Sequence, residues 1–251
     1  MEATALHHIC VVAKYPYLGT VKTRLEPALG KGGARDFAEL ALIETLQSFV
    51  GVALSRLVWS YAPAVAQADV ERLLRDNDLS QDCDAQPQPD AGDLGDRLAA
   101  AVASCSRPMK AATGTCTLVG TDCFALKREH VHRAIQRVQD GLGKTAYMIP
   151  ASDGGYVLLT VPLGLDSAKA FGNIRWSCPQ TAEDQSRRLS ELGLDVELGP
   201  TLQDVDEPGD LASVVEGDST SFPRTRQWLA RWSLLDTHGH GQGIGKAVQG
   251  R

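Results

Sequence analysis

Short apolar runs alternate with stretches of helical periodicity along most of this chain, and this alternation is what most restricts its fold. The first run, HHICVVA at residues 7–13, is rich in β-branched side chains and predicts a buried strand. Apolar residues at helical spacing follow over 34–50. Strands separated by helices are typical of an α/β fold with a largely parallel sheet and helices on both faces. We therefore expect a three-layer α/β/α architecture.

The other expected elements continue this order. Strands are predicted at 56–62, 115–122, 145–151 and 155–161, an extended segment at 195–205, and helices at 70–77, 94–104, 131–138, 179–193 and after Pro208. Residues 82–92 hold two prolines and little apolar content, which predicts a loop. A terminal amphipathic helix is expected at 224–235, before a Gly-rich segment predicted to be flexible. We divide the chain into a main domain at 1–216 and a C-terminal helix and tail at 217–251.

Charge and cysteine content narrow the function classes. The net charge of −6 disfavours binding to nucleic acids or anionic membranes, which a basic surface would attract. No apolar run reaches the roughly 18–20 residues of a transmembrane helix, and the first residues have no signal-peptide pattern. The six cysteines form no CxxC pair. We expect reduced thiols in a cytoplasmic protein.

Acidic residues follow several of the predicted strands. Asp122 ends GTD, Asp153 lies in the turn SDGG, and Asp204 and Asp206 lie in QDVDEPGD. Two carboxylates separated by one residue can approach one cation, and their hard oxygen atoms suit Mg²⁺ or Mn²⁺. Taken singly, each acid is better explained by a helix cap or a turn, and Asp210, just after a proline, fits a cap well. Three acidic groups at one sheet edge favour a metal site.

A basic loop follows the first strand. GTVKTRL, at 19–25, brings together Gly19, Lys22 and Arg24. Lysine and arginine are donors to phosphate, and glycine permits close approach of the backbone to a ligand. The loop matches neither the G-x-x-x-x-G-K-[ST] phosphate loop nor the G-x-G-x-x-G fingerprint, so it is either a solvated turn or an anion-binding loop.

The order of several motifs resembles one family. The motifs are AKYPYLGTVKTRLEPALG, GDLGDRL, LVGTDCFAL, PASDGGYVLL, IRWSCPQT and LQDVDEPGDL. Together they span about residues 7–212 and resemble the DUF2064 family, also called rSAM/selenodomain-associated transferase 1. That family lies within the glycosyltransferase-A (GT-A) nucleotide-diphospho-sugar transferase superfamily. The chain is also similar to 2-phospho-lactate guanylyltransferases and, more distantly, to molybdenum-cofactor guanylyltransferases.

The resemblance implies a Rossmann-like sheet that binds an NTP or a nucleotide sugar, a small-molecule acceptor, and Mg²⁺ or Mn²⁺ on the phosphates. Lys22 and Arg24 match the loop expected to contact the triphosphate. Asp122, Asp204 and Asp206 match acids expected to hold the metal.

The remaining site residues implied by the resemblance fall into two groups. Gly19, Gly95 and Gly120 are expected on the nucleotide side. Asp153, Gly154, Gly155 and Trp176 are expected on the acceptor side, with Asp153 as a catalytic residue. Trp176 could stack on a base or pack beneath the acceptor, and packing in the core explains it at least equally well.

Two departures from the family pattern bear on the chemistry. Phe124 stands where the family commonly has proline, and Cys123 follows Asp122, which is therefore only one half of a D-x-D motif. This favours nucleotidyl transfer, in which an acceptor oxygen attacks the α-phosphorus of an NTP and pyrophosphate leaves. Glycosyl transfer from a nucleotide sugar is the alternative, and a non-catalytic nucleotide-binding regulator is the alternative from another class.

Histidine pairs add no further site. His238 and His240 form an H-G-H pair, but a flexible Gly-rich tail is the favoured interpretation. His130 and His132 lie two apart on a predicted helix and cannot share one face. The sequence leaves the oligomeric state open, a homo-oligomer included.

Overall fold

A seven-stranded sheet forms the centre of the computed structural model, which describes residues 7–106, 114–218 and 220–236. The strands are β1 (His7–Lys14), β2 (Ser55–Ala62), β3 (Cys83–Pro87), β4 (Thr115–Val119), β5 (Thr145–Pro150), β6 (Tyr156–Pro162) and β7 (Asp195–Leu198). Their order across the sheet is β3-β2-β1-β4-β6-β5-β7. Only β6, among these strands, runs antiparallel to its neighbours, β4 and β5. The largely parallel sheet is as predicted.

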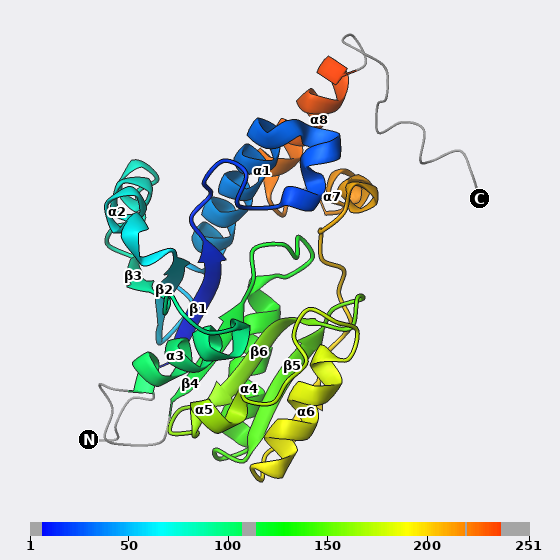
Figure 1. Ribbon diagram of the computed structural model, residues 1–251. Coiled ribbons are helices and arrows are strands. Elements are labelled where there is room, and N and C mark those ends of the chain that lie inside the picture. Colours follow the sequence, from blue (N-terminus) through cyan, green and yellow to red (C-terminus); the bar gives the residue numbers. More distant parts are fainter. Residues whose placement is uncertain (1–6, 107–113, 219, 237–251) are drawn as a thin grey trace, which may run out of the picture.

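Helices cover both faces of the sheet (Figure 1). They are α1 (Glu26–Phe49), α2 (Gln67–Asp76), α3 (Leu94–Ser106), α4 (Arg128–Asp140), α5 (Ser167–Ala170), α6 (Thr181–Glu191), α7 (Leu211–Glu216) and α8 (Pro223–Asp236). The apolar stripes of α1, α2 and α4 share one buried cluster with the sheet, and those of α3, α5 and α6 share another. The three-layer α/β/α prediction is confirmed.

The alternation of side chains along β1 explains why both faces are buried. Ile9 and Val11 point into the layer under α1, α2 and α4, whereas Cys10 points into the layer under α3. A parallel strand covered on both sides reads as a continuous apolar run, as HHICVVA does.

Two predictions about the secondary structure are wrong, one about the type of an element and one about where a helix begins. Residues 83–87 form the edge strand β3 rather than a loop, because the backbone of this polar segment pairs in parallel with β2 from Leu57↔Cys83 to Tyr61↔Pro87. The first long helix starts at Glu26 rather than near residue 34, with Pro27 in its first turn and a break at Gly30, where φ is +66°. The glycines that seemed to precede the helix lie inside it.

The last helix packs on the first. Figure 1 shows α1 and α8 side by side at one end of the molecule, with α7 near them. Trp228, Leu229 and Trp232 of α8 join a buried cluster with Phe37 of α1 and Phe124. The H-G-H pair at 238–240 lies outside the described residues. Within the described ranges, no helix combines the length and the apolar character that crossing a membrane requires.

Candidate active site

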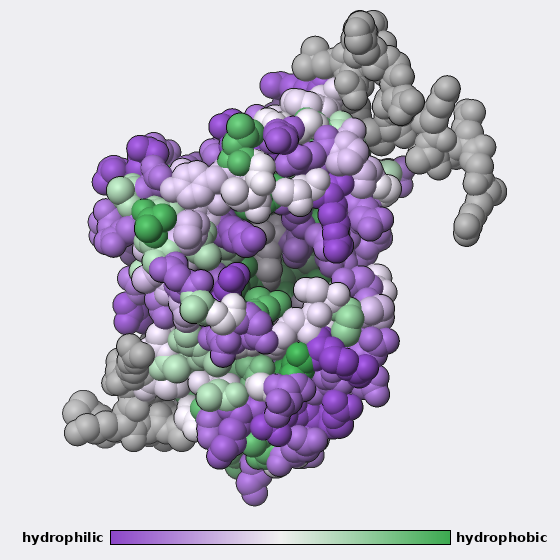
Figure 2. Space-filling view, viewed as in Figure 1, coloured by the Kyte–Doolittle hydropathy of each residue, from purple (hydrophilic) through white to green (hydrophobic). Residues whose placement is uncertain are grey.

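The predicted site residues converge at the carboxyl ends of β1, β4 and β5. These strands share one direction, so the segments that follow them meet at one edge of the sheet, where open α/β sheets bind ligands. Two cavities of about 360 Å³ and 370 Å³ open there. Both are lined by Val12, Arg24, Gly120, Asp122 and Asp206. Figure 2 shows a hollow between the part of the molecule formed by α1 and the part formed by the sheet.

The extended segment 199–206 carries the acidic pair into this edge. It runs beside the end of β5, where Leu202 N donates to Pro150 O at 3.0 Å. It then reaches the loop after β4, where Val205 N donates to Asp122 O at 2.9 Å. Val205 is buried, so the side chains on either side of it, those of Asp204 and Asp206, face the cavity that they line.

Three carboxylates form the group best suited to a divalent metal. Oxygen atoms of Asp153, Asp204 and Asp206 lie within 4.8 Å of one another. Several carboxylate oxygens around one point are the donor set that Mg²⁺ and Mn²⁺ prefer, so the residues fit such an ion. The structure thus places Asp153, predicted on the acceptor side, beside Asp204 and Asp206, two of the three predicted metal ligands.

Lys22 accounts for the position of Asp122. The Lys22 ammonium donates to Asp206 Oδ1 at 2.7 Å, to the Val205 carbonyl at 2.6 Å and to Asp122 Oδ2 at 3.2 Å. Its side chain is only 13% exposed. Burial alone would lower the pKa of Lys22, but the charges of Asp122 and Asp206 and its hydrogen bonds to them outweigh it and raise the pKa. Asp122 is therefore paired with a fixed cation, and its predicted role as a metal ligand stays a prediction.

Arg24, unlike the buried Lys22, is exposed and has a single charged partner among the described residues. Its side chain is 69% exposed, and its Nη1 lies 4.0 Å from Asp206 Oδ2. An exposed guanidinium at the mouth of both cavities can turn towards an anion. Gly19, with φ at +72°, forms the exposed turn ahead of this loop.

The turn SDGG packs tightly on the start of α6. The Asp153 carboxylate accepts from Gly155 N at 2.7 Å, and Gly154 O accepts from Ala182 N at 2.9 Å. Gly154 has φ at +89°, and a Cβ there would overlap the backbone of Pro179. Glycine at 154 therefore holds Asp153 at its place beside Asp204.

Replacing Gly154 by alanine is expected to lower the free energy of unfolding by about 1–3 kcal/mol, because it adds a steric overlap to an unfavourable φ. Thermal denaturation measures the effect. Gly143→Ala is the matched control, since Gly143 has φ at +80° and no atom within 4 Å of its added Cβ. Equal losses in the two variants would show that the contact with Pro179 does not matter.

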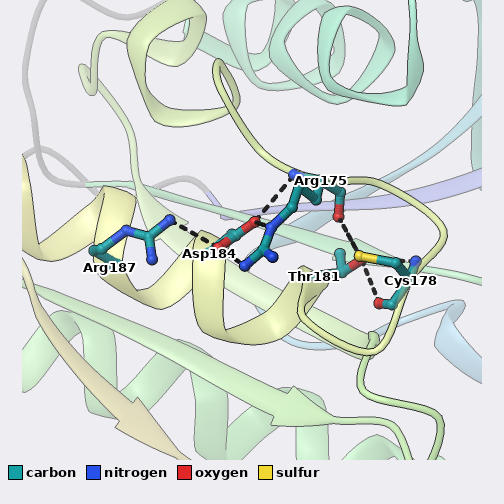
Figure 3. A network of polar contacts seen from close by, with 5 residues as sticks. All are labelled: Arg175, Cys178, Thr181, Asp184 and Arg187. Atoms are coloured by element: carbon teal, nitrogen blue, oxygen red, sulfur yellow. Dashed lines mark hydrogen bonds and ion pairs between the residues drawn. The ribbon is translucent and has the colours of Figure 1, made fainter.

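The segment between α5 and α6 forms the far wall of the first cavity. Figure 3 shows how Asp184 of α6 holds it: the buried carboxylate accepts from Arg175 Nε at 2.7 Å and from Arg187 Nη2 at 2.7 Å. Thr181 Oγ1 donates to the Arg175 carbonyl at 2.8 Å. The hydrogen bond from Arg175 is the main reason why the pKa of Asp184 is lowered. These contacts therefore hold the segment between α5 and α6 at Arg175 and again at Thr181, where α6 begins.

Trp176 follows Arg175 and lines this cavity. Its indole N–H is buried and has no hydrogen-bond partner among the described residues. Gly95 lies against it, where a Cβ would approach the indole nitrogen to 2.9 Å. Gly95 therefore serves close packing of α3 on this wall, and its predicted contact with a nucleotide stays a prediction. Gly120 leaves room for the Asp122 carboxylate, which a Cβ would approach to 2.8 Å.

Other lining residues were missed by the sequence analysis. Leu94, Leu98, Tyr156 and Cys178 complete the first cavity. They lie within the motifs GDLGDRL, PASDGGYVLL and IRWSCPQT, but only the packing of α3 and α6 on the sheet brings them together. Asp210 is confirmed as a cap: its Oδ2 accepts from Asp206 N at 3.1 Å and from Glu207 N at 2.8 Å.

The cluster of carboxylates should make the stability of the protein depend on pH. Burial, followed by the charges of Asp153 and Asp122, raises the pKa of Asp204 to about 6. In the unfolded chain an aspartate titrates near about 3.9, so between these values the folded state binds more protons and loses stability as the pH rises. In EDTA, wild type should therefore lose more thermal stability between about pH 5 and pH 7 than Asp204→Asn does. Identical pH profiles would contradict this.

Comparisons with known proteins identify the family and the fold of the chain. The model of a family described as an uncharacterized protein conserved in bacteria, DUF2064, matches residues 45–178. This range includes Asp122, Asp153 and Trp176 but neither the basic loop nor the segment 199–206. No curated protein matches the sequence.

Three solved structures are similar over most of the chain. A protein from Desulfovibrio desulfuricans G20, provisionally described as a nucleotide-diphospho-sugar transferase, is 25% identical, with a TM-score of 0.78 over 93% of this chain and 98% of its own. CMP:2-keto-3-deoxy-manno-octonic acid synthetase, complexed with CTP, is 12% identical, with a TM-score of 0.50 over 90% and 99%. The mannosyltransferase PcManGT from Pyrobaculum calidifontis, in complex with GDP-Man and Mn²⁺, is 8% identical, with a TM-score of 0.50 over 98% and 79%.

The last two share the fold alone, whereas the first also shares a quarter of its residues. The fold is that of the nucleotide-diphospho-sugar transferases of the GT-A superfamily, and the chain is an enzyme of that superfamily. With the family match over more than half of its length, the chain belongs to the bacterial DUF2064 family.

Proposed function

We propose that the protein transfers a nucleotidyl group from an NTP to a small anionic acceptor and releases pyrophosphate. One observation carries this proposal: a buried lysine and three clustered carboxylates lie side by side where two cavities meet. Fixed positive charge next to a divalent-metal donor set is what a triphosphate requires. The solved relatives include proteins in complex with CTP and with GDP-Man, which supports a nucleotide as one substrate.

The basic loop would bind the phosphates. The Lys22 ammonium can exchange a carboxylate partner for a phosphate oxygen without leaving its place, because Val205 O continues to accept from it. Arg24 would turn from Asp206 towards the outer phosphates, where a guanidinium can bind two oxygens. Both charges would offset the charge that develops on the leaving pyrophosphate.

Asp204 and Asp206, with Asp153 or Asp122, would hold the metal. A bound Mg²⁺ or Mn²⁺ would supply charge neutralisation on the phosphates. An acceptor oxygen would attack the α-phosphorus as the bond to the bridging oxygen breaks, and pyrophosphate would leave with that electron pair. An anionic acceptor needs no strong base, and the indole N–H of Trp176 and the backbone of the turn at 152–155 would orient it.

Glycosyl transfer is the second candidate, and it depends on Asp153. In that reaction Asp153 would take the proton of an acceptor hydroxyl. The position of Asp153 within 4.8 Å of Asp204 and Asp206 oxygens favours metal ligation instead.

We also propose a cytoplasmic location for the protein, whichever of the two reactions it catalyses, since its six cysteines are free thiols.

Product analysis separates the candidates. Incubation with each NTP, Mg²⁺ and a panel of small phosphates and carboxylates should release pyrophosphate. Release of a nucleoside diphosphate from a nucleotide sugar would identify a glycosyltransferase instead. Nucleotide binding without any turnover across both panels would favour the non-catalytic alternative.

A further inference from the structure

Three cysteines from separate elements meet inside the layer under α3, away from the active site. Cys10 comes from β1, Cys105 from α3 and Cys116 from β4. Their Sγ atoms are 3.3 Å (10–105), 3.8 Å (10–116) and 3.7 Å (105–116) apart. Each residue is at most 3% exposed. The proposed transfer reaction uses none of them.

These separations match a metal–thiolate site. In a tetrahedral site with Zn–S bonds of about 2.3 Å, neighbouring sulfur atoms lie about 3.8 Å apart. Two of the three separations agree with this value, and the third is about half an ångström shorter. A disulfide would need about 2.05 Å between one pair, and it would leave the third thiol in contact with both. Mutual proximity of three thiols is what a soft cation requires.

His8 is the candidate for a fourth donor. It lies two residues before Cys10, so it shares that face of β1, and it is paired in register with Cys116 of β4. His8 is 3% exposed, and its Nδ1 is buried without a hydrogen-bond partner among the described residues. His7 points to the other face and is paired with Thr115. The ring nitrogens of His8 do not lie within 4.8 Å of all three Sγ atoms, so the imidazole would have to turn towards the three thiols to complete a Cys₃His set.

We infer that Cys10, Cys105, Cys116 and His8 form a structural site for a thiophilic d¹⁰ cation of the Zn²⁺ class. On binding, the three thiols would lose their protons to solvent, and Zn²⁺ with three thiolates would carry a net charge of −1. Arg56, which is paired in register with His8 on the next strand, is itself ion-paired with Asp84. The site joins α3 to two central strands.

This position links the metal to the active site through α3. Cys105 lies near the end of α3, and Leu94 and Leu98 near its start line the first cavity. Metal binding at one end of the helix would fix the cavity wall at the other. The metal would therefore stabilise the position of α3 and, through it, the cavity wall, without touching substrate.

Refolding with Co²⁺ tests the assignment, because thiolate ligation gives intense charge-transfer absorption that carboxylate sites do not give. Denatured, reduced protein is refolded under reductant with Co²⁺. Wild type is expected to bind one equivalent with sulfur charge-transfer bands, to lose them when Zn²⁺ is added, and to melt at a higher temperature with Zn²⁺ than in EDTA.

Variants locate the ligands. Cys105→Ala should lose most of the band, and His8→Asn should weaken binding by about tenfold or more. Cys83→Ala, a buried cysteine of β3 outside the group, should bind like wild type. The inference is overturned if natively folded wild type shows no charge-transfer band, if Cys105→Ala keeps the full band, or if mass analysis finds a Cys10–Cys105 disulfide in place of metal.

Discussion

Lys22→Met is expected to weaken NTP binding by about 10- to 150-fold. Methionine keeps the length of the side chain but removes a buried ammonium whose contacts to charged oxygens are each worth about 1.5–3 kcal/mol. The loss should already be seen in affinity, because the ammonium would contact the phosphates of the bound nucleotide before the transfer step. Isothermal titration with the best NTP in Mg²⁺ measures it.

Lys31→Met is the matched control. Lys31 is an exposed lysine of α1, outside both cavities, and its loss should leave affinity unchanged. Circular dichroism must first show that Lys22→Met is folded, because the change leaves Asp122 and Asp206 without their shared cation. A folded Lys22→Met that binds as wild type does would mean that this lysine only neutralises the two aspartates.

Asp204→Asn is expected to reduce turnover by about 10²–10³-fold while nucleotide binding in EDTA is retained. The asparagine keeps the shape of the side chain but removes one charge from the donor set, and a metal ion contributes several kcal/mol to phosphoryl transfer. Pyrophosphate release at saturating NTP, across a series of Mg²⁺ concentrations, measures both the rate and the metal requirement.

Asp195→Asn serves as the control for that change. Asp195 is an exposed aspartate at the start of β7, which runs parallel to β5, so it lies at the opposite edge of the sheet from the acidic pair. It should leave both the rate and the Mg²⁺ dependence unaltered. An Asp204→Asn enzyme with the wild-type rate and Mg²⁺ dependence would remove Asp204 from the metal site.

Elements with an apolar pattern could be predicted from the sequence, and those held by backbone pairing alone could not. The β1 sequence is apolar on both faces because both are covered, so it was recognisable. Strand β3 has only one well-buried residue, Cys83, and pairs through backbone groups that any side chain allows. The start of α1 was obscured by Gly30, which interrupts the helical pattern although the chain continues as a helix.

The candidate site shows the same division. The residue types and their places at strand ends were predictable, because parallel strands deliver their carboxyl ends to one edge. The partners were not. That Lys22 is buried between Asp122 and Asp206 depends on a left-handed backbone at Lys22, with φ at +45°, and on the course of 199–206 along β5. Neither the left-handed backbone at Lys22 nor the course of residues 199–206 can be recognised from the residue types in the sequence.

The most direct test of a metal-dependent nucleotide enzyme is a thermal-shift panel of the NTPs and nucleotide sugars, with Mg²⁺ and with EDTA. A ligand that binds the folded state raises the melting temperature, and at a given concentration a tighter ligand raises it more. We predict that at least one NTP stabilises the protein, and that the shift is clearly larger with Mg²⁺ than with EDTA. Equal shifts in Mg²⁺ and EDTA, or no shift with any nucleotide, would contradict the assignment of the lysine and carboxylate group as a metal–triphosphate site.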